Sequence, residues 1–383
     1  MAATVPSTLV KLSDGDAAGC AQVGAPRPHL PAVARRLRVG VPSHIALIPR
    51  ATGHGNVWGH LLQELAGLVE LEIVAAKPCD TAGPVDVWLA DGHGRSLAVS
   101  APVVVVVHEA GWNTDFLRSF LASDFLKVID RQTAACSRAA AAVITPSRSA
   151  CRQVVDHYGV AREKVHVVPY GVDHSIFRPS LQGGAELIAR AGGESRRPYI
   201  LCVGQVHPRK NFAAVRAALD DLALKGFPHQ LVTVRRAPAG CADQSDSRLA
   251  AARPLPLSGR AVVSITRPSD VELAALMASA AAFCQPSFME GFGLTVLEAM
   301  ACGVPVVVSD RGSLPEVVDS AGIIVPPTAD ALARALAKLL RDPKGAEEMG
   351  KRAHRRAAEY SWNRTAAGWL AAIKAVVPES GPF

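Results

Sequence analysis

A glycine turn between two carboxylates is the strongest chemical pattern in this chain. Glu290 and Glu298 stand on either side of Gly291-Phe292-Gly293, eight residues apart, and an apolar run follows from Leu294. Glycine lets the backbone turn tightly, so we expect a helix to begin near Leu294. The first amides of a helix have no intrahelical partner and bind anions well. The turn is therefore a candidate diphosphate site.

The two glutamates suit hydroxyl-rich ligands. Glu298 lies about one turn into the expected helix, where its carboxylate could accept two hydroxyl donors from a diol such as a ribose. Glu290 precedes the turn and could hold the hydroxyls of a sugar. The alternative for each residue alone is structural: Glu290 as a cap of the helix and Glu298 as an exposed helix residue.

The elements that would position these residues alternate between strand and helix, which is typical of parallel α/β sheets. In the first half we expect strands at Arg38–Val41, Leu71–Ala75, Val85–Leu89, Val103–Val107, Ala142–Thr145 and Lys164–Val168. Helices are expected at Val57–Leu68, Asp115–Ala140 and Arg148–Tyr158, the last capped by Ser147. The unbroken valines of 103–107 favour a strand that is buried on both faces.

A second alternation follows a segment rich in glycine and proline. Strands are expected at Tyr199–Val203, Gln230–Val234, Ala261–Ile265, Ala282–Gln285, Val304–Ser309 and Gly322–Val325. Helices are expected at Phe212–Lys225, Val271–Ala280, Leu294–Cys302, Ala329–Leu340, Ala346–Tyr360 and Trp362–Val376, and Ala237–Pro256 as a surface insertion. The two alternations predict an α/β fold with two Rossmann-like domains. Open sheets bind ligands at the carboxyl ends of their strands, so we expect the two domains to face a cleft that holds the site.

The predicted organisation has five parts. Residues 1–36 form a loose extension, 37–178 a first Rossmann-like domain, 179–198 a linker, 199–358 a second Rossmann-like domain and 359–383 a C-terminal helical segment. A chain of 383 residues is long enough for about two domains. The first 35 or so residues have no apolar stretch after a charged one, so we expect no signal peptide.

Charge and cysteine content exclude several classes of protein. The net charge is +7, but the basic residues are scattered and only 5% of residues are aromatic, which argues against nucleic acid as a partner. The eight cysteines have no CxxC spacing, so we expect reduced thiols and a cytoplasmic protein. No strand-end Asp-x-Asp pair and no cluster with ligand spacing occurs, so we expect no metal and no cofactor.

The string SFMEGFGLTVLEAMACGVPVVVSDRGSLPEVV resembles the donor-site signature of the retaining GT-B glycosyltransferases of family four, also called group 1. That family has a Glu-x7-Glu motif followed by EAMACG-P-V-V and PEV segments. VGQVHPRKN at 203–211 is similar to its G-R-x-x-x-x-K-N stretch, and YGVD at 170–173 and Ser361-Trp362 are similar to its linker entry and terminal segment. The resemblance covers about residues 37–378 and is most specific over 199–325.

The resemblance implies a role for each matching position. Glu298 would hold the nucleotide ribose, and Glu290 would contact the donor sugar together with Gly291 and Phe292. The diphosphate would lie on Gly293, Leu294 and Thr295, with Lys210 neutralising the leaving group. His108, after the valine run, would touch the donor sugar, and Gly55 in the loop Gly53-His54-Gly55 would approach the phosphates. Glu290, His108 and Lys210 would be the catalytic residues.

Two positions depart from the family pattern. Gln205 stands where the family often has arginine, so Arg209 is the candidate substitute as a phosphate ligand, with a solvated surface residue as the alternative. Arg235-Arg236 stands where a glycine-containing turn is common. These departures motivate a second hypothesis, a catalytically weak nucleotide-sugar-binding or partner subunit. A third, a Rossmann oxidoreductase, is disfavoured because no G-x-G-x-x-G follows the first expected strand.

The expected activity is transfer of a hexose from GDP-mannose or a UDP-hexose to a hydroxyl of a sugar, lipid-linked or small-molecule acceptor. Arg118, Lys127, Arg131 and Arg138 punctuate one long helical segment. They keep peripheral contact with the inner face of a membrane open, against the alternative of a solvated helix face.

Overall fold

A computed structural model describes residues 36–46, 53–68, 71–76, 85–92, 99–110, 124–204, 207–235 and 262–377. Several positions discussed above lie outside the described residues: the extension 1–35, Arg118, Gln205, Arg236 and the expected insertion Ala237–Pro256.

The first sheet is parallel and has six strands in the order β2-β1-β3-β4-β5-β6. Its strands are β1 (Leu37–Pro42), β2 (Leu71–Ala76), β3 (Val87–Asp91), β4 (Val103–Val106), β5 (Ala142–Thr145) and β6 (Val165–Val167). The valine run forms the expected buried strand, since Val104, Val105 and Val106 are at most 2% exposed. The ends of β3 and β4 therefore carry Asp91 and His108 to the same edge of the sheet.

The helices of this half are α1 (Ser43–Ala46), α2 (Gly53–Ala66), α4 (Asp124–Ala139) and α5 (Arg148–Tyr158), with a 3-10 turn at Arg162–Lys164. Ser147 caps α5 as expected, because its side chain accepts a hydrogen bond from the Ala150 N–H. The expected start of the first long helix at Val57 was wrong. Gly53-His54-Gly55 forms the first turn of α2, where glycine is tolerated because first-turn amides need no helical acceptor.

The second sheet is also parallel, in the order β12-β11-β10-β7-β8-β9. It contains β7 (Tyr199–Val203), β8 (Gln230–Arg235), β9 (Val262–Thr266), β10 (Ala282–Gln285), β11 (Val306–Ser309) and β12 (Ile323–Val325). The helices are α6 (Gly184–Arg190), α7 (Phe212–Leu224), α9 (Asp270–Ala278), α10 (Leu294–Ala301), α11 (Leu314–Val318), α12 (Ala329–Arg341) and α13 (Pro343–Ala357), with 3-10 turns η2 (Pro208–Lys210) and η3 (Asp319–Ala321). Strands β7 and β10 are neighbours, so the segments that follow them meet.

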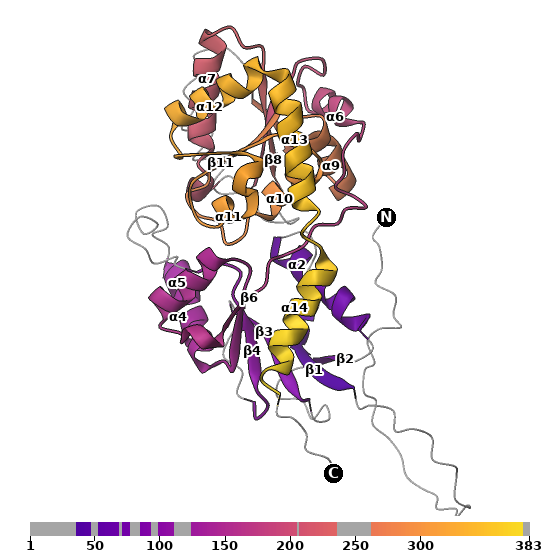
Figure 1. The fold of residues 1–383 in the computed structure, drawn as a ribbon, viewed down its shortest axis with the longest axis vertical. Coiled ribbons are helices and arrows are strands. Elements are labelled where there is room, and N and C mark those ends of the chain that lie inside the picture. The colour runs from indigo at the N-terminus through magenta and orange to yellow at the C-terminus, as the bar shows by residue number, and fades with distance from the viewer. Residues whose placement is uncertain are drawn as a thin grey trace, which may run out of the picture.

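The last helix, α14 (Trp362–Lys374), leaves the second half of the chain and packs beside α2 and the first sheet (Figure 1). Trp369 meets Trp58 edge to face at 5.4 Å between ring centroids, and Trp362 stacks on His60 at 4.9 Å. Aromatic pairs of this kind add to the free energy gained from burial. The end of the chain thus ties the two halves together.

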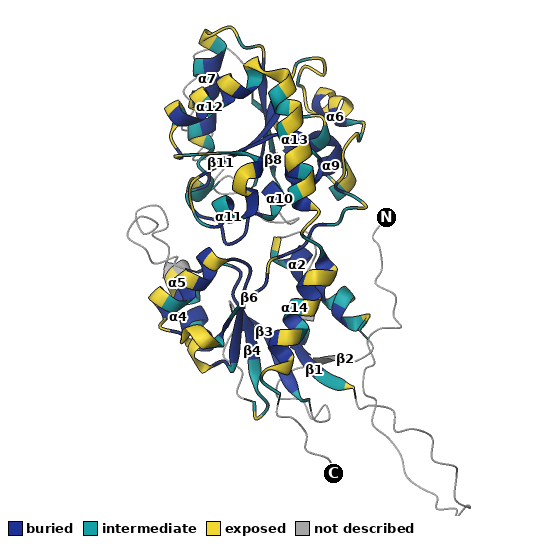
Figure 2. Cartoon of the chain, viewed as in Figure 1, coloured by how far each residue is buried: buried dark blue, intermediate teal, exposed yellow. Residues whose placement is uncertain are grey.

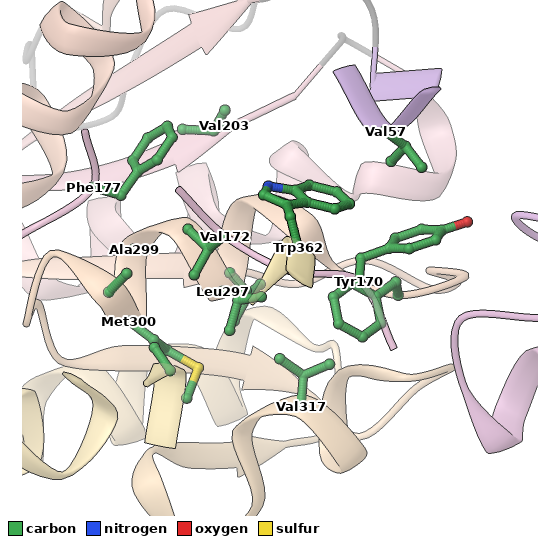
Figure 3. Close-up of a cluster of buried hydrophobic side chains, with 14 of the residues drawn as sticks. Val57, Tyr170, Val172, Phe177, Val203, Leu297, Ala299, Met300, Val317 and Trp362 are labelled. Atoms are coloured by element: carbon green, nitrogen blue, oxygen red, sulfur yellow. The ribbon is translucent and has the colours of Figure 1, made fainter. Parts of the chain in front are cut away.

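Figure 2 shows both sheets as buried interiors beneath helices whose outer faces are exposed. One continuous apolar cluster joins the halves, and Figure 3 shows part of it, including Val57, Tyr170 and Trp362 as well as Leu297, Met300 and Val317. Packing of side chains from both halves limits how the sheet edges can move relative to each other.

Candidate active site

A cleft of about 440 Å³ lies between the two sheets. The first half contributes His54, His108, Glu109 and Tyr170, and the second half His207, Arg209, Lys210 and the run from Glu290 to Thr295. A second hollow of about 500 Å³ lies between β12, α12 and α13, and is lined mainly by aliphatic side chains. The charged groups converge in the cleft, so we assign the chemistry there.

The glycine turn takes the form expected from the sequence. Helix α10 begins at Leu294, and Gly293 precedes it with φ +93, a conformation that favours glycine. A Cβ on Gly293 would also lie 2.7 Å from Leu314. Within the described residues, no protein group accepts from the N–H groups of Gly293, Leu294 and Thr295. These amides line the cleft and are available to an anion.

Glu290 is the most heavily bonded carboxylate of the cleft. Its Oε1 accepts from Lys210 Nζ at 2.6 Å, Ser287 Oγ at 2.6 Å and Gln285 Nε2 at 3.0 Å. Burial opposes the charged form of this side chain, but the charges of Lys210 and Arg209 outweigh it and lower its pKa to about 2. Glu290 is therefore an anion at neutral pH.

Lys210 and Arg209 share the turn η2 at the end of β7. The Arg209 C=O accepts from the Phe288 N–H at 2.8 Å, which joins η2 to the segment that precedes Glu290. Burial lowers the pKa of Lys210, and the Glu290 carboxylate partly offsets that effect. The Arg209 guanidinium lies 3.4 Å from both Glu290 and Glu109, and its side chain is 18% exposed. Arg209 thus bridges the two halves and is not a solvated surface residue.

His108 lies at the end of the valine strand and uses both ring nitrogens within the protein. Nε2 is 3.2 Å from Asp91 Oδ2, and Nδ1 is 2.5 Å from the Tyr170 hydroxyl. Asp91 Oδ2 also accepts from Trp58 Nε1 at 2.8 Å. Burial raises the pKa of Tyr170 well above its ordinary value, so the phenol stays protonated. The consistent assignment is that Nε2–H donates to Asp91 and that Tyr170 O–H donates to Nδ1.

Sequence reasoning missed the Asp91, Tyr170 and Trp58 side chains. The available signal was a carboxylate at the end of a buried strand, in VWLAD. His108 lines the cleft, and the sugar contact expected of it stays a prediction. Its carbonyl oxygen would lie 2.0 Å from a Cβ on Gly291, so only glycine fits between the two walls here.

Three other residues predicted from the sequence, Phe292, Glu298 and Gly55, are buried. Phe292 is 5% exposed, and its ring packs edge to face on Tyr170 at 5.2 Å. Glu298 is 1% exposed within α10 and is not among the lining residues of the cleft. Gly55 is buried in the first turn of α2, whereas its neighbours Gly53 and His54 line the cleft. The ribose and phosphate roles of Glu298 and Gly55 stay predictions.

A second set of contacts joins the two halves of the chain. The Glu316 carboxylate of α11 accepts from the N–H groups of Arg148 at 2.9 Å and Ser149 at 2.6 Å, at the start of α5. Beside it, the Ser147 hydroxyl donates to the Gly291 C=O at 2.7 Å. A carboxylate at a helix N-terminus is favoured by the amides and the helix dipole. The glycine turn of the second half is therefore held directly by the first half.

Within the described residues, no group of three or more His, Cys, Asp or Glu side chains is placed to hold a metal ion. None of their helices has the length and apolar character needed to cross a membrane.

Comparisons with known proteins bear on the family and the fold of this chain. The family model described as glycosyl transferases group 1 matches residues 185–356, and the model described as glycosyltransferase family 4 matches residues 80–176. The chain is 31% identical over 240 residues to an MMP α-(1→4)-mannosyltransferase of Mycolicibacterium hassiacum, a match that covers 61% of this chain and 54% of the relative. The chain spans about half the length of the curated relatives it matches.

Solved structures share the fold. A sucrose-phosphate synthase of Thermosynechococcus elongatus aligns with a TM-score of 0.70 at 20% identity, over 89% of this chain and 99% of the other. HepE of Anabaena, solved with UDP and glucose, aligns with a TM-score of 0.63 at 17% identity, over 88% and 100%. With two parallel sheets, a cleft between them and both family models matched, the chain belongs to the group 1 glycosyltransferases of family four and has their GT-B fold.

Proposed function

We propose that this chain transfers a hexose from a nucleoside-diphosphate sugar to an acceptor hydroxyl, with retention of the anomeric configuration. The observation that carries the proposal is the grouping of Lys210, Arg209 and the uncapped amides of α10 around Glu290 in one cleft. Cations and helix amides suit a diphosphate, and a buried carboxylate suits the hydroxyls of a sugar.

The charges also suit departure of a diphosphate. Breaking the anomeric C–O bond leaves negative charge on the diphosphate, and Lys210 with the α10 amides is placed to stabilise that charge as it develops. These groups supply positive charge from the protein itself, so we propose a reaction that needs no metal ion.

The direction of attack follows from the carboxylates. Among the described lining residues the carboxylates are Glu109 and Glu290, and each is paired with Arg209. A carboxylate with a pKa of about 2 is a weak base and a poor nucleophile. We therefore propose attack from the face that the leaving group departs from. The acceptor oxygen forms the new bond to the anomeric carbon, and its proton passes to the departing phosphate oxygen.

Donor and acceptor are proposed by class. The mannosyltransferase relative supports GDP-mannose, and the neighbour solved with UDP and glucose supports a UDP-hexose. The acceptor hydroxyl belongs to a sugar, a lipid-linked or a small-molecule acceptor bound on the first-domain side of the cleft. Of the basic residues raised as a membrane contact, Lys127, Arg131 and Arg138 are exposed on α4, which is equally the character of a solvated helix face.

The first test is a thermal-shift screen of the whole chain against GDP-mannose, UDP-glucose and other nucleotide sugars, since a ligand that binds the native state raises its unfolding temperature. The donor that stabilises best is then incubated with sugar and lipid-linked acceptors. We expect a product whose anomeric configuration matches that of the donor, read by NMR. An inverted product contradicts the proposal.

A binding-only protein is the competing function, and the same protein preparation separates the two. Binding of a donor without hydrolysis or transfer, across the acceptors tested, would favour the partner-subunit hypothesis. Turnover that persists unchanged in both Glu290→Ala and Lys210→Ala would show that the chemistry lies elsewhere.

A further inference from the structure

His207 lines the cleft and stands in the sequence between Gly204, which follows β7, and the two cations of η2. It precedes Pro208 at the start of η2, and it lines the same cavity as Arg209, Lys210 and Glu290. Sequence reasoning passed over it, because a single histidine in a loop has no distinctive signature. Its neighbours in the fold are the two cations and the carboxylate of the cleft, so its hydrogen bonding bears on ligand binding.

The hydrogen bonding of His207 assigns its proton. The Arg209 backbone N–H lies 3.2 Å from His207 Nδ1. A backbone N–H can only donate, so Nδ1 must be the acceptor, and the proton of the neutral ring is on Nε2. Within the described residues, no protein group bonds to Nε2. The ring of this cleft-lining residue therefore has one N–H donor without a described protein acceptor.

The ring is also kept neutral. Burial, reinforced by the charges of Arg209 and Lys210, lowers the pKa of His207 to about 4. A third cation at this point would repel the two already there. A neutral N–H can instead donate to an anion without adding to that repulsion, so its contribution should not depend on pH in the neutral range.

We propose that His207 is a binding residue for the donor, and that its Nε2–H donates to an oxygen of the diphosphate group. This inference rests on the proposed function, because it takes the occupant of the cleft to be a nucleoside diphosphate. Lys210 and Arg209 supply the charge, the α10 amides receive one part of the diphosphate, and His207 supplies a neutral, directed donor beside them.

Two substitutions separate this role from a merely structural one. His207→Asn keeps an acceptor near the Nδ1 position, so the Arg209 N–H stays capped, but it removes the donor at Nε2. His207→Gln places an amide N–H near the Nε2 position. His157→Asn, on the exposed end of α5, is the matched control outside the cleft.

Binding of UDP and GDP to each purified chain is measured by calorimetry at pH 6, 7 and 8. We expect His207→Asn to weaken the preferred diphosphate about tenfold, as for loss of a hydrogen bond to a charged group. We expect His207→Gln to recover most of that loss and His157→Asn to match the unsubstituted chain. The ratio of the Kd of His207→Asn to that of the unsubstituted chain should stay constant from pH 8 to pH 6.

Other outcomes decide against the inference in distinguishable ways. If the unsubstituted chain binds UDP or GDP and His207→Asn binds it equally well, His207 is not a ligand, and the proposed function is untouched. A Kd ratio that grows towards pH 6 would mean that a charged ring binds. A loss seen with the nucleotide sugar but not with the diphosphate would move the contact to the sugar. No binding of any nucleotide by the unsubstituted chain overturns the proposed function, and this inference with it.

Discussion

The two walls of the cleft differ in how their polar groups are satisfied. On the first-domain wall, Asp91, His108, Tyr170 and Trp58 bond to one another through buried atoms. On the second-domain wall, Lys210 is paired with Glu290, and the N–H groups of Gly293, Leu294 and Thr295 at the start of α10 have no acceptor among the described residues. A ligand can take over the charge of Lys210 and these amides, whereas the buried Asp91 carboxylate is already held by Trp58 and His108. The first wall therefore fixes shape, and the second wall supplies binding and charge stabilisation.

Of the substitutions considered, Lys210→Ala should have the largest effect on transfer. We expect transfer to slow by about 10²–10³-fold, because the substitution removes a cation placed at the leaving diphosphate. It also leaves the buried Glu290 without its closest partner, so the unfolding temperature should fall. Steady-state rates and thermal unfolding measure the two effects, with Lys225→Ala on the exposed end of α7 as the control. Rates within threefold of the unsubstituted chain would contradict the assignment.

Glu290 makes the second wall sensitive to acid. Its pKa is lowered from an ordinary 4.5 to about 2 in the folded chain. The stability that this carboxylate contributes is present above pH 4.5 and is lost as the pH falls towards 2, on the order of a few kcal/mol. Urea unfolding of the unsubstituted chain and of Glu290→Gln between pH 5 and pH 3 tests this. The difference in unfolding free energy between them should shrink with falling pH; a difference independent of pH argues against the paired carboxylate.

Asp91→Asn should affect the first wall in a different way. The amide no longer offers a charged acceptor to both Trp58 Nε1 and His108 Nε2, so the imidazole loses its fixed orientation. We expect kcat to fall about tenfold, with little change in the affinity for the nucleoside diphosphate. Tyr170→Phe removes the hydroxyl that bonds to His108 Nδ1. It should likewise lower kcat with little change in nucleoside-diphosphate affinity. If either variant weakens nucleotide binding as strongly as Lys210→Ala does, the division of labour between the walls is wrong.

Glu316→Gln addresses the contact that holds the walls together. A neutral amide oxygen can accept only weakly from the Arg148 and Ser149 N–H groups and loses the attraction to the start of α5. We expect the KM for the donor to rise about threefold, and the radius of gyration from X-ray scattering to increase slightly. Glu347→Gln, on the exposed face of α13, is the control. An unchanged KM and an unchanged radius of gyration would mean that Glu316 plays no part in holding the two halves together.

The second wall was largely predictable because its residues are close in sequence or follow recognisable turns. The start of α10 at Leu294 follows from Gly291 and Gly293, since glycine permits a turn that other residues resist. Lys210 was placed at the same wall through its resemblance to a strand-end motif, and the parallel neighbours β7 and β10 bring it to Glu290. The start of α2 was misplaced because first-turn glycines look like a loop in sequence.

Apart from the position of His108 after the valine run, the bonding of the first wall and the Glu316 contact could not be read from the sequence. Asp91 and His108 are separated by 17 residues, His108 and Tyr170 by 62, and Arg148 and Glu316 by 168. Each of these residues has an ordinary structural interpretation when it is taken alone. Residue type and local spacing establish turns, strands and helix starts, because these depend on backbone conformation over a few residues. Which carboxylate orients which histidine depends on the order of strands in a sheet and on the packing of two domains, and these arise only when distant segments fold together.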